Sequence, residues 1–264
     1  MLNKKNYFDL EGVNALVTGC TGHLGESISL CLAENGANVY LNGRNKKKII
    51  LLKKKINKRG YKCCPAIFDI TKEKQVKNFF KDKKNFGIII NNAYDGKTGK
   101  FINYSKLNYE KAFKISVLST ANIINESMKS LINSTKINGF ASIINISSIY
   151  ANFSPDPNIY KNTNLDNPPY YGVAKSGLQQ LTKYAAVNLA KHNIRVNTIS
   201  PGPFPNNQIK KKYPNFIKKL KKKVPLNRVG SPDELCTAIL FLSSKYSSYV
   251  TGINLPVDGG WSIW

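Results

Sequence analysis

Thr18-Gly19-Cys20-Thr21-Gly22-His23-Leu24-Gly25 is the stretch from which the fold of this chain can be predicted. It follows an apolar run at 13–17 that predicts a buried strand, and a helical pattern through Ala33 comes after it. Strand, glycine-rich turn and helix form the context of a dinucleotide-binding loop, because glycines let the backbone approach a pyrophosphate at the helix N-terminus. An ordinary strand-to-helix turn would not need three glycines. The expected contacts are Gly19, Thr21, Gly22, His23, Leu24 and Gly25.

The rest of the chain alternates strands with helices. Apolar runs predict further strands within 36–41, 61–68, 86–90, 142–146, 194–199 and 252–256. Helical patterns lie between them at 49–58, 71–83, 107–131, 168–191 and 232–242. Strands that are apolar throughout are typical of a parallel sheet covered by helices on both faces. We therefore predict an α/β fold, a single doubly wound (Rossmann) domain over residues 1–264 with about seven strands.

Two long stretches lack a clear pattern. Residues 151–169 are rich in Pro, Asn and Asp, and residues 203–225 are interrupted by prolines and rich in lysine. Both follow the carboxyl ends of predicted strands, where open α/β sheets bind ligands. Loops of this length are usually functional. We expect a substrate-loop insertion at 151–169 and a lid-like segment at 203–225.

The composition is that of an ordinary globular protein, with 264 residues of which 42% are hydrophobic. No apolar run approaches the roughly 20 residues that span a bilayer. The first residues lack the apolar stretch of a signal peptide. Five cysteines follow neither a disulfide framework nor a zinc-ligand spacing. We expect a cytoplasmic protein without membrane insertion and without a metal site.

The net charge of +25 allows two interpretations. A basic surface can bind nucleic acid or another anionic partner. Alternatively, the lysines are the solvated faces of amphipathic helices, since Phe216, Ile217 and Leu220 fall among them at helical spacing. We favour the second interpretation and expect no nucleic-acid partner, because no recognised nucleic-acid-binding module accompanies the lysines. The charge would also favour an anionic substrate.

The end of the second predicted strand indicates the cofactor. NAD-binding sites usually place an acidic residue there for the ribose hydroxyls, whereas this chain has Arg44, which could pair with a 2′-phosphate. NADP(H) is therefore favoured, with NAD(H) possible and a solvent-exposed Arg44 as the alternative. After the third strand, Asp69 and Ile70 would meet the adenine, or Asp69 would cap the next helix.

Tyr171 and Lys175 lie four residues apart in a helical pattern, and hence on one face of the helix. A cation close to a phenol favours the phenolate and lowers the tyrosine pKa. Such a pair suits proton transfer to or from a carbonyl or alcohol oxygen. The spacing also arises by chance in lysine-rich helices, so its meaning depends on the remaining motifs.

These residues together resemble the short-chain dehydrogenase/reductase family over nearly the whole chain. The motifs in family order are the three glycines of the first turn, Asp69, Asn91-Asn92-Ala93, Ser148, Tyr171 with Lys175, Asn197, Pro201-Gly202 and Asp258-Gly259-Gly260. Each motif alone is weak, but the ordered set is specific. The resemblance implies an oxidoreductase that passes a hydride between a nicotinamide and a carbonyl or carbinol carbon.

The resemblance also implies roles for individual residues. Tyr171 would be the general acid in reduction and the general base in oxidation. Lys175 would lower the pKa of Tyr171 and hold the nicotinamide ribose, and Ser148 would hydrogen-bond the substrate oxygen or merely cap a turn. The residues that the resemblance adds to the cofactor site are Asn91, Asn92, Ala93, Tyr171, Lys175, Pro201 and Gly202. For the two asparagines, tying neighbouring strands together is an equally good role.

The chain departs from the family pattern in four places. The glycines are spaced G-x-x-G-x-x-G, so His23 occupies the usual middle-glycine position. Ser116 stands where an asparagine often completes a catalytic tetrad, and it could hold a water near Lys175. Tyr94 replaces a glycine, and its ring would narrow the site. The segment between the catalytic serine and tyrosine is longer than in most members.

The insertion and the ending Gly259-Gly260-Trp261-Ser262-Ile263-Trp264 are similar to a subgroup found with bacterial surface-carbohydrate and flagellin-modification genes. This similarity implies a sugar, sugar phosphate or nucleotide sugar as substrate, and the family implies a homodimer or homotetramer. We expect an NADP(H)-dependent oxidoreductase. The alternatives are a non-catalytic protein that senses a cofactor or binds nucleic acid, and a dehydratase or epimerase that keeps its cofactor bound.

Overall fold

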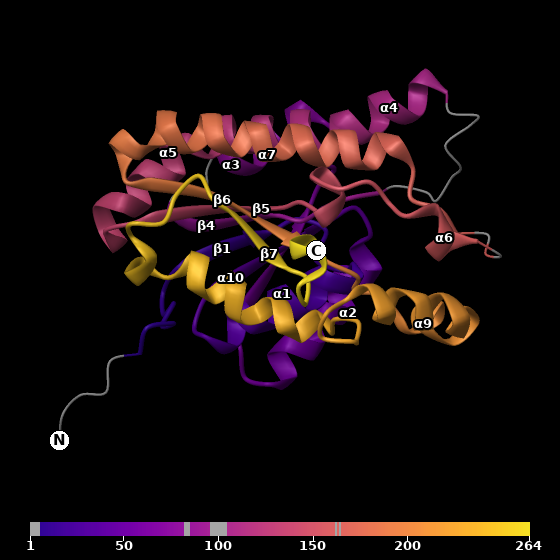
Figure 1. Cartoon of the computed structure of the whole chain (residues 1–264). Helices are drawn as coiled ribbons and strands as arrows, with labels where there is room; N and C mark the ends of the chain where they lie inside the picture. The colour runs from indigo at the N-terminus through magenta and orange to yellow at the C-terminus, as the bar shows by residue number, and fades with distance from the viewer. Residues whose placement is uncertain (1–5, 82–84, 96–104, 162, 164) are drawn as a thin grey trace.

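Seven parallel strands form one sheet within residues 6–81, 85–95, 105–161, 163 and 165–264, which the computed structural model describes. The strand order is β3-β2-β1-β4-β5-β6-β7, so the chain winds outward from β1 in both directions (Figure 1). The strands are β1 (Asn14–Val17), β2 (Asn38–Gly43), β3 (Cys63–Ile67), β4 (Phe86–Asn91), β5 (Ala141–Ile146), β6 (Ile194–Pro201) and β7 (Asn254–Val257). The predicted doubly wound α/β fold is confirmed.

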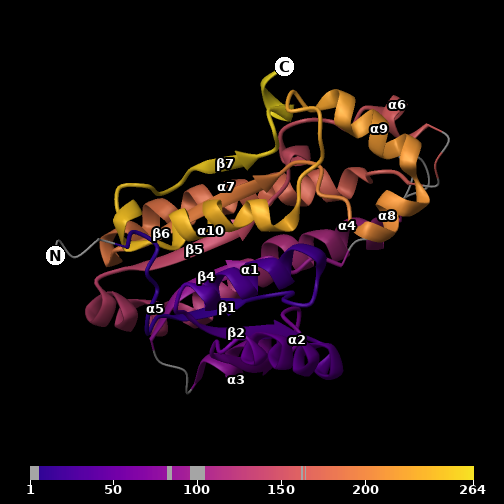
Figure 2. The ribbon, with the colours of Figure 1, turned by 90° about the horizontal axis from the view of Figure 1, so that it is seen from below.

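Helices cover both faces of the sheet (Figure 2). One face carries α1 (His23–Glu34), α2 (Lys46–Lys58) and α10 (Cys236–Ser243). The other carries α3 (Glu73–Lys81), α5 (Ser119–Asn138) and α7 (Pro169–Leu189), and α4 (Lys106–Phe113) packs against α7. Predicted and observed bounds agree within a few residues except for the helix predicted at 107–131, and the last two residues predicted for the helix at 71–83 lie outside the described residues. In the described part of the chain, no helix is both long and apolar enough to cross a membrane.

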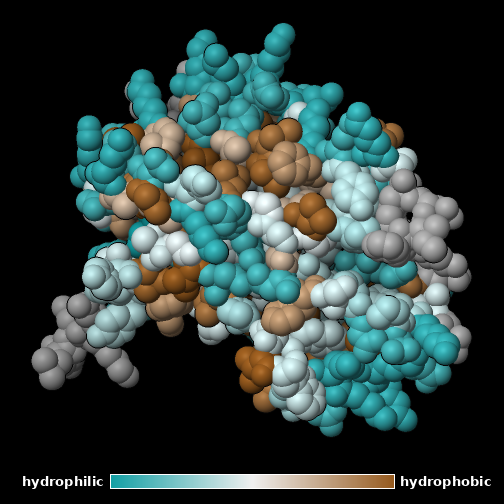
Figure 3. All heavy atoms as spheres, turned by 45° about the horizontal axis from the view of Figure 1, so that its top comes forward, coloured by the Kyte–Doolittle hydropathy of each residue, from teal (hydrophilic) through white to brown (hydrophobic). Residues whose placement is uncertain are grey.

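The outer surface of the second helical layer is partly hydrophobic. Figure 3 shows hydrophobic side chains among hydrophilic ones on this face. The exposed ones on α4, α7 and the turn after α4 are Leu107, Tyr109, Phe113, Leu118, Val173, Tyr184 and Val187.

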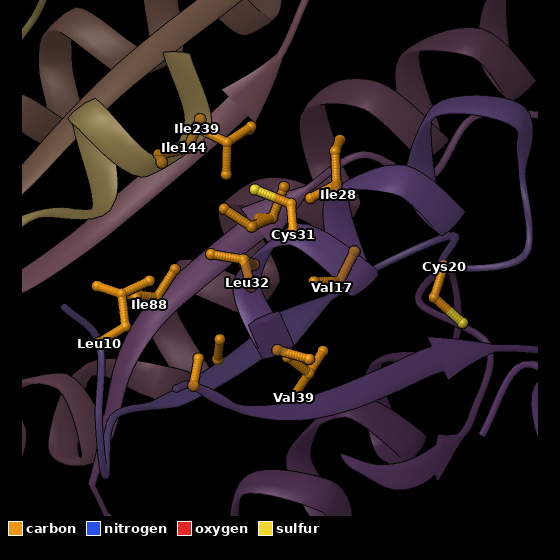
Figure 4. Close-up of a cluster of buried hydrophobic side chains, with 14 of the residues drawn as sticks. Leu10, Val17, Cys20, Ile28, Cys31, Leu32, Val39, Ile88, Ile144 and Ile239 are labelled. Atoms are coloured by element: carbon orange, nitrogen blue, oxygen red, sulfur yellow. The ribbon is translucent and has the colours of Figure 1, made fainter. Parts of the chain in front are cut away.

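The strands are apolar throughout because each buries side chains on both faces. In β1, Ala15 and Val17 pack towards α1 and α10, whereas Leu16 packs towards α3 and α5. The first of these two core clusters brings together Val17, Ile28, Leu32, Val39, Ile88, Ile144 and Ile239 (Figure 4). Burial on both faces explains why continuous apolar runs predicted the sheet.

The helix observed in place of the long helix predicted at 107–131 is irregular in its middle. It contains a π-helical turn at Lys114–Leu118, between α4 and α5, and it continues to Asn138. Such turns insert an extra residue into the helical repeat and occur often at functional sites. Ser116 lies in this turn and is 2% exposed. The π-helical turn contacts α7, the helix that carries Tyr171 and Lys175.

The prediction that 151–169 and 203–225 are irregular was wrong in part. The first contains α6 (Pro157–Tyr160), and the second contains α8 (Asn207–Lys212) and α9 (Pro214–Lys223). Prolines stand at the N-termini of α6 and α9, where the missing N–H group has no helical partner to lose. These prolines therefore begin helices. The amphipathic helix that the spacing of Phe216, Ile217 and Leu220 indicated is confirmed in α9, where these three side chains are buried.

The two segments pack against each other. Ile159 of α6 forms a small apolar cluster with Phe216, Ile217 and Leu220 of α9. The Nζ of Lys219 donates to the carbonyl oxygens of Asn158 at 2.8 Å and Lys161 at 3.2 Å. Lys223 forms an ion pair with Asp156 at 3.0 Å. The described parts of the insertion and of the 203–225 segment therefore form one unit at the carboxyl end of the sheet.

Candidate active site

The predicted site residues meet at the carboxyl ends of the central strands. The glycine-rich turn follows β1, Ser148 follows β5, and β6 ends at Pro201. A groove of about 570 Å³ lies along the glycine-rich turn, and a cavity of about 340 Å³ lies under the insertion and the 203–225 segment. We call them the cofactor groove and the substrate cavity. Tyr94 lines both.

The glycine-rich turn packs tightly against the segment after β4. Gly19 has a φ of +64°, and a Cβ there would lie 2.8 Å from the Cα of Ala93. A Cβ on Gly25 would lie 2.2 Å from the carbonyl oxygen of Gly19. Larger side chains would therefore displace the turn, and the backbone that the glycines leave uncovered forms the wall of the cofactor groove. These features fit a dinucleotide, whose pyrophosphate needs close backbone approach.

A hydrogen-bond network fixes this turn. The side chain of Asn92 donates to the carbonyl oxygens of Thr18 at 3.0 Å and Gly19 at 3.2 Å. The hydroxyl of Thr18 in turn accepts the backbone N–H groups of Asn92 at 2.9 Å and Ala93 at 3.1 Å. Thr18 was not singled out in the sequence, because its partners lie more than seventy positions away along the chain.

Most predicted cofactor contacts line the cofactor groove. They are Gly19, Thr21, Gly22, His23, Leu24, Gly25, Arg44, Asp69, Ile70, Asn92 and Ala93. Asn91 is buried instead and donates from its side chain to Asn145 of β5 at 2.8 Å, so it ties two strands together. Tyr171 and Gly202 line the substrate cavity. The groove also contains Lys48 and Asp95, which the sequence did not indicate.

Arg44 lies at the edge of the groove beside an acidic side chain. Its guanidinium forms an ion pair with Asp95 at 2.5 Å, and this hydrogen bond raises the pKa of Arg44. Both side chains are more than half exposed, so the pair is open to exchange with another anion. Asp69 accepts hydrogen bonds from the backbone and hydroxyl of Thr71 at 2.9 and 2.8 Å. It thus stabilises the turn before α3, without capping the helix itself, and it also lines the groove.

His23, the first residue of α1, interacts with the 203–225 segment. Burial lowers the pKa of its imidazole, and the nearby Lys210 lowers it further, while a hydrogen bond to the backbone of Phe204 opposes both effects. The side chain therefore connects the glycine-rich turn to the segment above it. The imidazole interacts with residues outside the turn, which explains why a histidine is tolerated at a position where most family members have a glycine.

Tyr171 and Lys175 lie on one face of α7, as their spacing predicted. Lys175 is 4% exposed, and its Nζ donates to the carbonyl oxygen of Ile146 at 2.6 Å. The same nitrogen lies 5.8 Å from the centre of the Tyr171 ring. The hydroxyl of Ser148 is hydrogen-bonded to Tyr171, and it also accepts the N–H of Tyr150 at 3.1 Å. Ser148 therefore both caps its turn and contacts the tyrosine.

Burial is the main cause of the pKa shifts of Tyr171 and Lys175. It raises the pKa of Tyr171, and the hydrogen bond with Ser148 acts in the opposite direction. It also lowers the pKa of Lys175 from 10.5 to about 8. The expected lowering of the Tyr171 pKa by Lys175 is thus not found in this structure, because the loss of solvation around the phenol outweighs the other effects.

Two buried hydroxyls accompany the pair. The hydroxyls of Ser116 and Tyr94 are buried and have no hydrogen-bond partner among the described residues. The ring of Tyr94 packs edge-on against the ring of Tyr171, and the Nζ of Lys175 lies over the face of the Tyr94 ring. Burial also raises the pKa of Tyr94. Within the described ranges, no group of three or more His, Cys, Asp or Glu side chains could hold a metal ion.

A glycine-rich turn after β1, with a serine, tyrosine and lysine gathered at β5 and α7, defines a class of nucleotide-dependent oxidoreductases. Comparison with known proteins identifies the family within this class. A family model described as "Enoyl-(Acyl carrier protein) reductase" matches residues 21–262. The chain belongs to the short-chain dehydrogenase/reductase family, as its motifs indicated, and it is an oxidoreductase.

Curated relatives match along nearly their whole length. The chain is 29% identical over 256 residues to 3-oxoacyl-(acyl-carrier-protein) reductase FabG from Aquifex aeolicus, covering 95% of this chain and 98% of the relative. It is 31% identical over 261 residues to 7alpha-hydroxysteroid dehydrogenase from Paraclostridium sordellii, covering 96% and 93%. A third relative, gluconate 5-dehydrogenase from Gluconobacter oxydans, is 28% identical and covers 98% of both chains.

Solved structures agree in fold. The RhlG/NADP active-site complex from Pseudomonas aeruginosa has a TM-score of 0.87 and 26% identity, covering 98% of this chain and 100% of the other. A gluconate 5-dehydrogenase from Burkholderia cenocepacia, in complex with NADP and tartrate, has a TM-score of 0.85 and 26% identity, covering 97% of each chain. These similarities therefore extend over nearly the whole chain.

Proposed function

We propose that the protein is an NADP(H)-dependent oxidoreductase that transfers a hydride to or from a carbonyl or hydroxyl carbon of a polar substrate. The observation that carries this proposal is the gathering of Ser148, Tyr171 and Lys175. Ser148 and Tyr171 are hydrogen-bonded and line the substrate cavity, and Tyr94, which lines both the cavity and the cofactor groove, contacts Tyr171 and Lys175. We further propose that the substrate is a sugar or a sugar derivative. The gluconate dehydrogenases among the relatives support this class.

The cofactor groove suits a phosphorylated dinucleotide. The glycine-rich turn would hold the pyrophosphate, and Arg44 would pair with a 2′-phosphate after exchanging its Asp95 partner. NADP is named in the titles of two of the solved structures with this fold. The chemistry that bound NADP(H) supplies is hydride transfer at its nicotinamide ring. Pro201 and Gly202 would border that ring, and Lys175 would hold its ribose.

The residues of this chain would supply the proton and the positioning. In reduction, the Tyr171 hydroxyl donates its proton to the substrate oxygen, and the raised pKa keeps that proton in place at neutral pH. The Ser148 hydroxyl donates a hydrogen bond to the same oxygen. Lys175, charged below its pKa of about 8, stabilises the phenolate that Tyr171 becomes. Ser116 would hold a water in the π-helical turn beside α7.

The described parts of the insertion and of the 203–225 segment would act together as the roof of the substrate cavity. Their apolar cluster and the pairing of Asp156 with Lys223 hold them as one unit. Such a roof excludes water from the reacting carbon. The similarity of the insertion and the C-terminus to the surface-carbohydrate subgroup supports a role in carbohydrate biosynthesis.

We also propose that the protein acts as a homodimer or homotetramer in the reducing cytoplasm. The exposed apolar side chains of α4 and α7, among them Phe113 and Val187, support a subunit interface (Figure 3). The five cysteines are free thiols, which supports a reducing compartment.

Isotope transfer tests the proposal. With NADPH deuterated at the transferred position of C4, a screen of ketoses and nucleotide keto-sugars should give a deuterated alcohol and one equivalent of NADP⁺. An altered product without net NADPH consumption would instead indicate a dehydratase or epimerase that keeps its cofactor bound. Failure to bind either NADPH or NADH would contradict the proposal. Salt-dependent binding to DNA or RNA would then favour the nucleic-acid alternative.

A further inference from the structure

The substrate cavity carries an acidic charge although the protein as a whole is strongly basic. Among the described residues that line this cavity, Asp166 is the charged one, and no lysine or arginine is present. The side chain of Asp166 is half-buried, and one of its oxygens accepts the N–H of Asn167 at 2.8 Å. The net charge of +25 is therefore no guide to the charge of the substrate.

No lysine of the nearby 203–225 segment lines the cavity, and three of these lysines interact with other groups. Lys223 pairs with Asp156, and Lys219 donates to two carbonyl oxygens of the insertion. Lys210 lies close enough to His23 to lower its pKa, on the side of the glycine-rich turn. These cations hold the roof together or lie beside the cofactor groove, and none of them lines the substrate cavity.

Two phenols give the cavity neutral hydrogen-bonding groups. The hydroxyls of Tyr150 and Tyr160 lie 2.9 Å apart, and burial raises the pKa of both, so both remain protonated at neutral pH. One hydroxyl donates to the other, which leaves one proton and several lone pairs for a ligand. The Tyr160 ring also packs 5.4 Å from that of Phe216, so flat apolar surfaces surround these hydroxyls.

We propose that Asp166 and the Tyr150–Tyr160 pair form a subsite for an uncharged polyhydroxylated group, such as a neutral sugar. This inference rests on the proposed function and narrows its substrate class. A carboxylate accepts hydroxyl hydrogen bonds strongly, and aromatic rings cover the apolar faces of a sugar. A phosphate or carboxylate in the same cavity would face Asp166 at short range, in a setting where like charges repel strongly. A cavity of about 340 Å³ is also near the lower end of the ligand-sized range.

Binding measurements on the NADP⁺-loaded protein test the subsite without requiring turnover. The probes are D-fructose, which is neutral, and D-fructose 6-phosphate and 5-keto-D-gluconate, which are anionic. We expect D-fructose to bind at least about tenfold more tightly than either anion. In Asp166→Asn, which keeps the shape and the bond to Asn167, that preference should fall by about tenfold. Tyr160→Phe should weaken D-fructose binding while leaving the discrimination against the anions.

Asp9→Asn is the matched control. Asp9 is an exposed acidic residue that accepts the backbone N–H of Glu11 at 3.0 Å, a bond that asparagine can keep, and it does not line the cavity. It should leave the preference unchanged. Equal or tighter binding of the anions, a preference that survives Asp166→Asn, or no binding of D-fructose would overturn the inference. If one of these binding results were found but deuterium transfer from NADPH still occurred, the subsite would be wrong and the proposed function would stand. If D-fructose bound as expected but no deuterium transfer occurred with any substrate, the proposed function would be wrong and the subsite would stand.

Discussion

The ring of Tyr94 packs edge-on against the ring of Tyr171, with 4.9 Å between their centres and 70° between their planes. The Nζ of Lys175 lies 5.2 Å from the centre of the Tyr94 ring. Tyr94 therefore contacts both Tyr171 and Lys175, the proposed proton-transfer pair. Where the family usually has a glycine, this chain has a side chain that restricts how Tyr171 and Lys175 can move.

Replacing Tyr94 separates the role of its ring from that of its hydroxyl. Tyr94→Phe removes a buried hydroxyl without a described partner, so stability should rise by up to about 1 kcal/mol and kcat should stay near its original value. Tyr94→Ala loses an aromatic contact worth about 0.5–1.5 kcal/mol, so kcat should fall by up to about tenfold. Steady-state kinetics and urea unfolding measure both effects. Equal loss of activity in the two variants would contradict the role given to the ring.

Lys175 should destabilise the fold at neutral pH. Its folded pKa of about 8 lies below the ordinary 10.5, which corresponds to roughly 3 kcal/mol. This loss of folding free energy is fully present below pH 8. It disappears as the pH rises to about 10.5, because in that interval the unfolded state keeps the lysine proton that the folded state has lost. Lys175→Met should therefore be more stable than the natural protein at pH 7, with the difference shrinking by pH 10.

Urea unfolding at several pH values measures this difference. Lys183→Met changes an exposed lysine of the same helix and serves as the control, with no comparable pH dependence. A stability difference for Lys175→Met that is constant from pH 7 to pH 10 would show that burial does not lower the pKa of Lys175.

Ser116 is expected to act through a bound water. Ser116→Ala should lower kcat by about tenfold while leaving stability unchanged or slightly higher, because the hydroxyl has no partner among the residues described. Ser243→Ala is the matched control, since Ser243 in α10 has a buried hydroxyl that likewise lacks a described partner. It should alter stability similarly but not kcat. The same kcat loss in both variants would remove the proposed role of Ser116.

Arg44 is expected to select NADP(H). A charge-assisted hydrogen bond contributes about 1.5–3 kcal/mol, so Arg44→Ala should weaken NADPH binding by about 10- to 100-fold and leave NADH binding nearly unchanged. Asp95→Asn should have the opposite effect on NADPH, because it removes the present partner of Arg44. Fluorescence titration of both cofactors measures these changes. Parallel losses for NADPH and NADH in Arg44→Ala would argue against a 2′-phosphate contact.

Local sequence patterns were sufficient to predict the sheet and most of the cofactor groove. Apolar runs identified the strands because both faces of the sheet are covered. The three glycines identified a turn in which Gly19 and Gly25 leave no room for a Cβ atom. Tyr171 and Lys175 were predictable because a spacing of four residues fixes their relation within a single helix.

The features that escaped prediction depend on contacts between distant segments. The pairing of Arg44 with Asp95 and that of Tyr150 with Tyr160 need the folded chain. The raised pKa of Tyr171 comes from burial by several segments, which the lysine four residues away does not reveal. The short helix α6 was missed because its proline looks like a helix breaker unless it stands at the first position, whereas the helical spacing of Phe216, Ile217 and Leu220 did indicate α9.

The central claim is that Tyr171 transfers the proton. Tyr171→Phe keeps the ring that packs against Tyr94 and removes only the hydroxyl that Ser148 contacts. The decisive measurement is single-turnover oxidation of NADPH by the natural protein and this variant, with a substrate found in the deuterium screen. The account predicts unchanged NADPH affinity and a rate lower by about 10²- to 10⁴-fold. A rate within about threefold of the natural protein would contradict it.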